Sequence, residues 1–471
     1  MWSRRKFLAA LGSSSTAALA GVWASGCTGP KRRVESVAAL PIATQDFHLA
    51  FQHLASSLEQ PFLWSKKEQS DIRSVDPDET RFDIEVSNWI ALGGTTGGIR
   101  HQVLLNNPTP EKLAEAAQVL AAKGKGNDLA VKLPLLKSRS TLSPAALTRA
   151  RNAWDGKALA ELYSQSENFT DSRIIFRSAY SRFFQSRTLL ITADKHLQWE
   201  QSRNVRGVLI AAWTGKDVTT SKAEEASAGL PTPARFSDEL LSRRTKEVLA
   251  HLHARSAPEA GVYPLILSPA CSAQLLLDGI ALACEPRSMN LVPHEDAIAE
   301  TDRLVVKDTP NSGYAAFEFD DLGDTARPRQ LVGMTPTTLG QGNWRRDQNA
   351  RLRCLPSNLR LEPADLSKQT TLPQLLVGME RGVLLDGPLH CVLDSEGERF
   401  SLRASIGYEV RRGQLSGRVF GGLNVRSTIN DFIGRTEGIA NTPETFTTER
   451  HGLPVSISCP HWRSTAHVER A

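Results

Sequence analysis

The chain has 471 residues, which is too long for one ordinary hydrophobic core and predicts two or three domains. Hydrophobic residues make up 40% and charged residues 23%, as in globular proteins, so the composition excludes an intrinsically disordered, collagen-like or polytopic membrane protein. The net charge of +5 includes Arg4, Arg5 and Lys6, which we expect to be removed with a leader; the remaining 53 basic and 51 acidic residues leave +2 and give no sign of a nucleic-acid partner.

The N-terminus predicts an export signal over residues 1–26. Arg4, Arg5 and Lys6 precede a mildly apolar run, residues 9–24, which is too short and too rich in serine for a comfortable transmembrane helix. This pattern is typical of a twin-arginine signal, and an amphipathic N-terminal helix is the alternative. The twin-arginine pathway carries folded proteins, so we expect the chain to fold in the cytoplasm and to reside in the periplasm or on the outward face of the membrane.

Cys27 is a candidate lipidation site. It follows small residues from Ala24 onward, in a pattern that resembles a lipobox, where the thiol accepts a diacylglycerol. The usual leucine at the third position before the cysteine is Ala24 here, so ordinary signal cleavage near Ala20 or Ala24 is the alternative. Residues 27–45 are polar and predict a tether between an anchor and a folded body.

The other cysteines do not predict a disulfide framework or a zinc ribbon. They are odd in number and lack C-x-x-C spacing. An apolar segment surrounds Cys271 and Cys284, which predicts that these two are buried free thiols. The five are Cys271, Cys284, Cys354, Cys391 and Cys459.

The first half of the body predicts helices on a sheet. A strand over 82–92 and another over 99–105 flank a glycine-rich turn, which is no phosphate loop because Ile99 stands where a Walker motif needs lysine. Thr109 and Pro110 predict a helix that ends near Gly124. Three apolar runs then predict strands, over 174–176, 188–193 and 205–213. After them, Ser237 predicts the start of a helix that reaches Arg255.

The second half predicts one important helix followed by β structure. A short strand over 262–267 leads to Pro269 and a helix over 270–285. Residues 400–411 alternate between apolar and polar side chains, which indicates an amphipathic strand that continues after Gly413 as 415–425. Two earlier runs, 314–319 and 330–334, predict further strands. The fold class is therefore α+β, with helices on a sheet in the N-terminal domain and a mainly β C-terminal domain.

These pieces, in this order, resemble the TldD/PmbA family of metallopeptidase-related proteins. The resemblance covers 82–455 and rests on the glycine-turn hairpin with its helix, on residues 263–269 before the second long helix, and on 320–323, 356–359 and 404–413. It implies an N-terminal family domain over 46–260, a motif helix and junction over 261–300, and a β-rich C-terminal domain over 301–471. The family's association with DNA gyrase is not carried over, because an exported chain does not meet the chromosome.

The motif helix lacks the family's metal ligands. In the catalytic branch, the resemblance implies His-Glu-x-x-x-His after the Ser-Pro step and a cysteine near the C-terminus that completes a zinc site. Here Leu277 and Leu282 replace the two histidines, and a leucine has no lone pair for a metal. Asp278 replaces the glutamate and is interpreted as a polar or capping residue, and a residue near Phe446 takes the place of the cysteine. We therefore assign no catalytic residue and no metal or cofactor to this chain.

Other candidate metal sites are weaker. His251 and His253 lie two residues apart, and His294 with Glu295 has no second ligand at helical spacing. The acidic run Asp320, Asp321 and Asp324 lacks the oxygen spacing of a calcium loop and is interpreted as a β-turn with a solvated face. A relocated zinc site is left as an alternative; it could use His390, Cys391, Cys459, His461 or His467.

Three functions follow from these observations. The resembled family includes paired paralogues in which one chain holds zinc and the other completes a shared cleft, so we expect a pseudoenzyme: the exported, non-zinc-binding subunit of a heteromeric metallopeptidase acting on unfolded peptides. Its partners would be a zinc-bearing TldD-like paralogue and a peptide. The alternatives are an active metallopeptidase with a relocated metal site and a lipid-anchored binding or scaffold protein without a paralogue.

Overall fold

The computed structural model describes residues 42–76, 80–124, 137–140, 156–169, 171–213, 218–228, 236–250, 254, 258–285, 301–334, 336, 343–347, 349, 351–365 and 370–471. The predictions for Arg4, Arg5 and Cys27, and for the pairs His251/His253 and His294/Glu295, lie outside these residues. In the ranges that are described, no helix combines the length and the apolar character that a bilayer crossing requires.

The N-terminal domain is built on one long antiparallel sheet. Its main order is β3-β2-β1-β5-β6, and both β7 and the short parallel strand β4 pair with β6. The strands are β1 (Glu59–Val75), β2 (Thr80–Thr96), β3 (Ile99–Asn106), β4 (Lys137–Ser140), β5 (Ile174–Thr192), β6 (His196–Trp213) and β7 (Val218–Ala228). The predicted hairpin is confirmed: β2 and β3 pair around Gly97 and Gly98, whose positive φ angles suit glycine.

The apolar runs 174–176 and 188–193 belong to one strand, β5, and not to two. Sequence pattern divides them because the residues between them are rich in polar side chains. In the structure these residues stay in the sheet, since polar neighbours satisfy them: the Arg182 Nε donates to the Ser70 hydroxyl at 2.7 Å, and its guanidinium pairs with Glu85 at 3.2 Å. The strand therefore crosses the full width of the domain.

Two pairs of helices cover the ends of this sheet. At one end, α3 (Thr44–Ala55) packs on α4 (Pro110–Ala121), and Phe47, Phe51 and Leu113 are completely buried in their core. Burial of each such side chain contributes about 2 kcal/mol. Thr109 caps α4 as predicted, and α3 includes the last two residues of the segment expected to be a tether. At the other end lie α6 (Gly156–Glu167) and α7 (Asp238–Ala250). Ser237 caps α7, as predicted.

The C-terminal domain contains two main sheets. The larger has the order β16-β15-β14-β8-β20-β17, and β16 also pairs with β20, so five strands form a closed circuit. Its strands are β8 (Gly261–Leu267), β14 (Arg381–Leu393), β15 (Arg399–Arg411), β16 (Gln414–Thr428), β17 (Gly438–Ile439) and β20 (Trp462–Arg470). Short helices α9 (Leu372–Leu376) and α10 (Ile429–Gly434) flank it. The α+β prediction, with helices on a sheet first and a mainly β domain second, is confirmed.

The second sheet has the order β10-β9-β13-β19-β18. Its strands are β9 (Leu304–Asp308), β10 (Arg329–Val332), β13 (Asn358–Pro363), β18 (Glu444–Arg450) and β19 (Leu453–Cys459), and a separate ribbon joins β11 (Arg345–Arg346) to β12 (Leu352–Arg353). One large apolar core lies between the two sheets, around the helix that follows β8. The strand predicted over 330–334 is confirmed as β10.

Two predictions in this domain need correction. Residues 314–319 do not form a strand: Tyr314 and Ala315 lie in a turn where the Asn358 side-chain oxygen accepts the backbone N–H of Ala315, and Phe319 forms only an isolated bridge with Thr325. The alternation of β15 holds as far as Ile406, but a bulge between Tyr408 and Val410 then changes the register, so Glu409 is buried.

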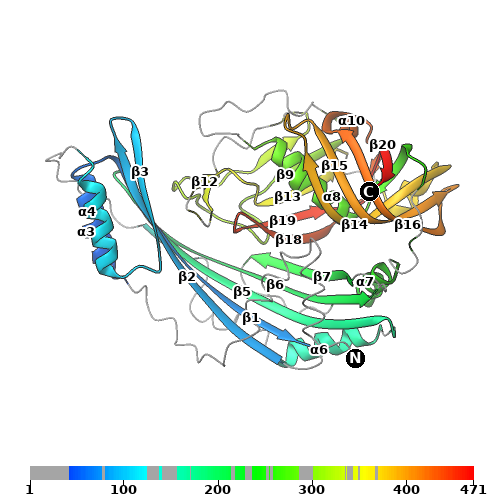
Figure 1. The fold of residues 1–471 in the computed structure, drawn as a ribbon, viewed down its shortest axis with the longest axis horizontal. Helices are drawn as coiled ribbons and strands as arrows, with labels where there is room; N and C mark the ends of the chain where they lie inside the picture. Colours follow the sequence, from blue (N-terminus) through cyan, green and yellow to red (C-terminus); the bar gives the residue numbers. More distant parts are fainter. Residues whose placement is uncertain are drawn as a thin grey trace.

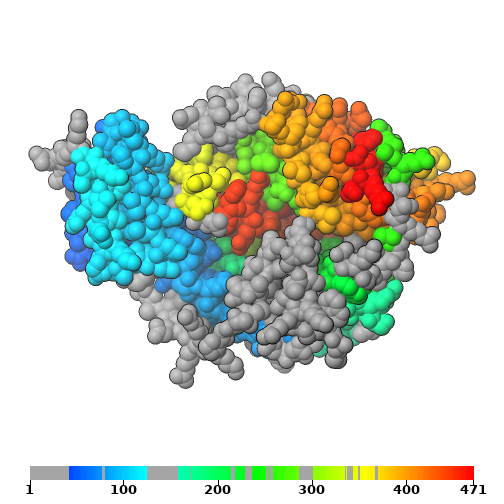
Figure 2. All heavy atoms as spheres, in the orientation of Figure 1, coloured from blue at the N-terminus to red at the C-terminus, as the bar shows by residue number. Residues whose placement is uncertain are grey.

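The N-terminal sheet curves around the C-terminal domain. Figure 1 shows its long strands running beneath that domain, with α3 and α4 at one end and α6 and α7 at the other. In the space-filling view, the blue end of the sheet stands directly beside the yellow residues of the C-terminal domain (Figure 2). Polar contacts join the two: Trp64 Nε1 donates to Asp321 at 2.9 Å, and Thr447 donates to Glu224 at 3.1 Å.

Asp321 belongs to this domain contact and Asp320 is buried next to it, so the predicted turn forms but its solvated face needs correction. Asp320 is 1% exposed, and its carboxylate accepts the backbone N–H groups of Leu322, Asp324 and Trp344 at 2.9–3.0 Å. Asp324 alone is exposed, and it pairs with Lys195 of the N-terminal domain at 2.8 Å. Asp320 and Asp321 organise this loop, because each of their carboxylate oxygens accepts a hydrogen bond from a protein N–H group.

Candidate functional site

The candidate site is the helix after β8, where the sequence places the degenerate motif. Ser268 caps α8 (Pro269–Leu275): its hydroxyl accepts the backbone N–H of Cys271 at 3.3 Å and donates to the buried Asp386 at 2.7 Å. Proline at the first helical position has no N–H that would need a partner. Both the Ser268 cap and Pro269 favour a helix start at this position. The predicted start at Pro269 is confirmed.

The motif itself lies on a π-helical turn, η2 (Leu276–Ala281), that continues α8. Hydrogen bonds from i to i+5 widen this turn, so residues five apart approach one face of the helix more closely than in an α-helix. Leu277 and Leu282 have this spacing. The backbone therefore brings the side chains of Leu277 and Leu282 toward the same face of the helix. Both side chains are aliphatic and cannot bind a metal.

The residues at the motif positions do not fit a metal ion. Leu277 is 8% exposed and packs in the main core of the C-terminal domain, and Leu282 is 37% exposed. Asp278 accepts a hydrogen bond from the Gln274 amide one turn earlier, and burial raises the pKa of its carboxyl although Arg450 acts in the opposite direction. A single carboxylate between two leucines cannot supply the three protein ligands of a catalytic zinc site.

Arg450, at the end of β18, adds a second obstacle to a cation. Its Nη1 donates to the Leu277 carbonyl oxygen at 3.0 Å and forms an ion pair with Glu285 at 3.0 Å. Burial raises the pKa of Glu285 to about 7, against the opposing effect of Arg450. A guanidinium bonded to the motif repels a divalent ion at the same place. Sequence reasoning missed Arg450, because its position beside the motif depends on the pairing of β18 with β19.

The residues of the relocated metal site do not come together. No three His, Cys, Asp or Glu side chains of the described residues are grouped to hold a metal ion, and His390, Cys391, Cys459 and His461 are all described. Cys391 lies against the motif helix near Gly279, whereas Cys459 is fully buried in β19. Burial raises the pKa of both thiols and lowers that of His461 to about 4. These four residues therefore do not form a metal site with one another.

Phe446 occupies the strand next to the motif helix. It lies in β18 opposite Ile457 of β19, is half-buried against the main core, and has the Arg244 guanidinium 6.0 Å from its ring centre. An aromatic side chain at this place continues the apolar surface of Leu277. Together these residues form a packed junction between the two sheets.

Residues 260–468 match the family model for the PmbA/TldA metallopeptidase C-terminal domain. No curated protein matches the sequence.

Three solved structures share the fold over most of the chain. A protein of Bacteroides thetaiotaomicron described as a modulator of DNA gyrase has 16% identity and a TM-score of 0.67, over 91% of this chain and 100% of that one. One of Thermotoga maritima with the same description has 16% identity and a TM-score of 0.60, over 87% and 96%. TldE from Thermococcus kodakarensis has 14% identity and a TM-score of 0.66, over 90% and 99%.

Proposed function

Because this chain belongs to the TldD/PmbA family and carries leucines where the motif needs imidazoles, we propose that it is the non-zinc-binding subunit of a heteromeric metallopeptidase. It forms a shared cleft with a zinc-bearing TldD-like paralogue and acts with it on unfolded peptides. The pair works outside the cytoplasmic membrane. This chain alone does not activate water, because Leu277 and Leu282 have no lone pair for a metal.

The observation that carries the proposal is the structure of the motif helix. The start of this helix, its π-helical turn and its place between the two sheets are all formed, yet its motif positions hold apolar packing and Arg450. Similarity in fold to TldE, over 90% of this chain, supports a place beside a second chain of the same family.

The leader supports the proposed location. Arg4 and Arg5 have the pattern of a twin-arginine signal, and that route accepts folded cargo, so an assembled pair can cross together. Cys27 gives the mature chain a site for a lipid anchor. A Cys27→Ser variant tests this step: the anchored form partitions into detergent, and the variant becomes soluble in the periplasm without loss of its partner.

The decisive experiment is purification from the native envelope, followed by metal analysis and mass spectrometry of whatever co-elutes. We expect zinc only in fractions that contain a second, zinc-motif chain, and peptide cleavage that a chelator abolishes in the same fractions. As a matched control, the chain is purified alone and receives zinc. Tight stoichiometric zinc and chelator-sensitive cleavage by the isolated chain would falsify the proposal.

A further inference from the structure

Two histidines meet where α3 packs on the N-terminal sheet, away from the motif helix. His196 is the first residue of β6 and is 4% exposed, and His48, in the second turn of α3, is half-buried. Their Nε2 atoms lie 3.4 Å apart, and their ring centres lie 5.0 Å apart with the ring planes at 76°. The two imidazoles therefore form a direct polar contact between the helix and the sheet.

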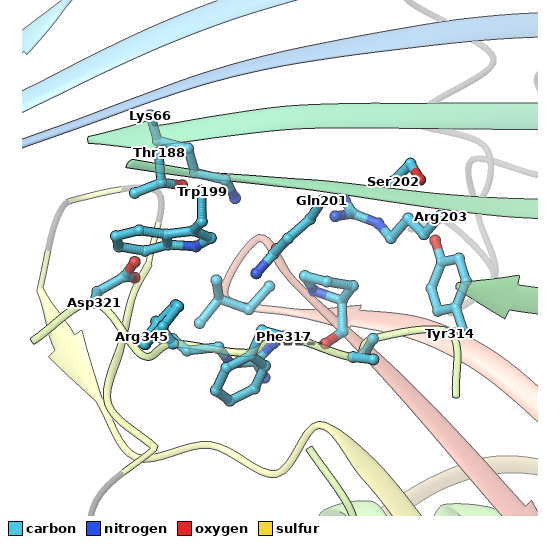
Figure 3. Close-up of a pocket in the computed structure, with 15 residues that line it drawn as sticks. Lys66, Thr188, Trp199, Gln201, Ser202, Arg203, Tyr314, Phe317, Asp321 and Arg345 are labelled. Carbon is cyan, nitrogen blue, oxygen red and sulfur yellow. Dashed lines mark hydrogen bonds between the residues drawn. The ribbon is translucent and has the colours of Figure 1, made fainter. Parts of the chain in front are cut away.

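The alternation of side chains along β6 determines the face on which His196 lies. A pocket between the sheet and the C-terminal domain is lined by residues that include Lys66, Trp199, Gln201, Arg203 and Arg345 (Figure 3). Trp199 comes three residues after His196, and the pairing of β6 with β5 is regular between them. Residues an odd number of positions apart point to opposite faces of a strand, so His196 points away from this pocket and toward α3.

The pair has too few ligands for a metal site. Catalytic zinc needs three protein ligands and structural zinc needs four. In the part of the chain that the structure describes, no third His, Cys, Asp or Glu side chain is grouped with the two rings to hold an ion. The spacing fits a hydrogen bond in which one Nε2–H donates to the lone pair of the other Nε2. This contact needs at least one neutral ring.

The nearest carboxylates are engaged elsewhere. Asp46, two residues before His48 on α3, accepts a backbone N–H at 3.0 Å. In the turn before β6, Asp194 accepts a hydroxyl at 2.8 Å, and Lys195 forms an ion pair with Asp324 at 2.8 Å. Among the described residues, none forms an ion pair with His48. A positive charge on His48 therefore has no carboxylate bound to it.

Other charges on the surrounding elements are of both signs. The charged residues of β2 lie at its far end, over 81–85, and Arg187 and Glu200 bond each other at 2.8 Å. β4 brings Lys137 into register with Leu197, the residue after His196. The remaining charged residues on the strands and helices next to α3 are Glu59, Lys67, Glu111, Lys112 and Glu115.

A second proton on the pair removes the contact and replaces it with repulsion. Once both Nε2 atoms carry hydrogen, neither ring can accept, and two positive charges face each other about 5 Å apart. Burial and the neighbouring His196 lower the pKa of His48 below its ordinary value of 6.5. The folded state therefore holds this proton less tightly than the unfolded chain. The contact stabilises α3 fully above pH 6.5 and is lost as the pH falls.

We infer that His48 and His196 form an acid-sensitive switch that holds α3 on the sheet at neutral pH and loosens it when both rings are protonated. The helix is otherwise held by apolar packing, in which Phe47, Phe51 and Leu54 are completely buried. Opening of α3 exposes this apolar surface at one end of the sheet. The response is local, because the pair touches no other element that carries the motif helix or the domain contact.

Hydrogen exchange of the purified protein at pH 5.0 and pH 7.5, followed by mass spectrometry, tests this inference. Rates are corrected for the intrinsic effect of pH, and α6, at the other end of the same sheet, is the internal reference. We expect the protection of α3 to fall at least about fivefold relative to α6 at the lower pH, as two like charges about 5 Å apart predict. An unchanged ratio, or an equal loss in both helices, would overturn the inference.

Two variants assign the effect to the pair. His48→Gln keeps a polar side chain that cannot charge, so the pH dependence of α3 should shrink to within about twofold. His53→Gln is the matched control: His53 is exposed in the last turn of the same helix, and this variant should keep the wild-type response. Melting curves at pH 7.5 show that each variant is folded. A wild-type response in His48→Gln refutes the switch.

Added zinc separates a switch from a metal site. At pH 7.5, micromolar zinc should leave the protection of α3 unchanged, because two imidazoles alone hold an ion poorly. Zinc-dependent protection that disappears in His48→Gln would identify a metal site and reject the switch. Neither experiment involves a partner chain or a peptide, so the result is independent of the proposed subunit role.

Discussion

Glu285, at the end of the motif helix, makes the stability of this protein depend on pH in an unusual direction. The side chain is 17% exposed, and burial raises its pKa from 4.5 to about 7; Arg450 and Arg353 oppose this effect, and Asp278 adds to it. Because the folded state holds the proton more tightly than the unfolded chain, the stabilising contribution is complete below pH 4.5. It is lost as the pH rises through 7.

The magnitude follows from the size of the shift. Each pKa unit corresponds to about 1.4 kcal/mol, so the rise from 4.5 to about 7 removes about 3 kcal/mol of folding free energy between pH 4 and pH 8. A Glu285→Gln variant has no proton to lose there. Relative to the wild type, it should therefore gain about 3 kcal/mol between these two pH values.

Urea unfolding of both proteins at pH 4.5, 6, 7 and 8 measures this gain. The fluorescence of Trp462, buried in the same domain, contributes to the signal of that domain's transition. Glu398→Gln, in the exposed turn before β15, is the control and should follow the wild type at every pH. Parallel pH profiles for Glu285→Gln and the wild type would show that the ion pair with Arg450 cancels the cost of burial, and the reasoning would be wrong.

Three further changes test the packing. Arg244→Ala removes the buried guanidinium that joins Glu247 of α7 to Glu444 of β18. Urea titration should show a free energy of unfolding lower by about 3–5 kcal/mol, and a loss below about 1 kcal/mol contradicts this. Asp320→Ala leaves three backbone N–H groups without their acceptor and should cost at least about 2 kcal/mol, measured in the same way. Gly207→Ala places a Cβ within 2.7 Å of a carbonyl oxygen of β7, so calorimetry should show a lower melting temperature; an unchanged one would show that the sheet adapts.

Local signals in the sequence predicted the parts of the fold that local forces determine. Thr109 and Ser237 each precede a helix that begins where the cap predicts, and Pro269 begins α8 as predicted. The hairpin turn at Gly97 and Gly98 needs positive φ angles, and only glycine adopts these without cost. The replacement of imidazoles by Leu277 and Leu282 was likewise readable, because the absence of a lone pair does not depend on context.

Features that arise from contacts between distant segments were not predictable. Asp320 looks solvated in the sequence, and its burial depends on the backbone N–H of Trp344, 24 residues later. Residues 314–319 have the pattern of a strand, but the Asn358 side chain bonds the backbone of Ala315 and the segment remains outside the sheets. The pocket combines Lys66, Arg203 and Arg345, which no spacing rule joins, since their proximity depends on how the N-terminal sheet curves around the second domain.

The closed circuit of strands has a consequence for how the protein is made. Strand β20 lies between β8 and β16 and pairs with both, and the amide of Ala471 donates to Gly422 at 2.8 Å. A nascent polypeptide whose β20 is still inside the ribosome cannot complete this circuit. The second domain therefore reaches its native state only after β20 has left the ribosome, and a premature stop codon within β20 removes a central strand and not a dispensable tail.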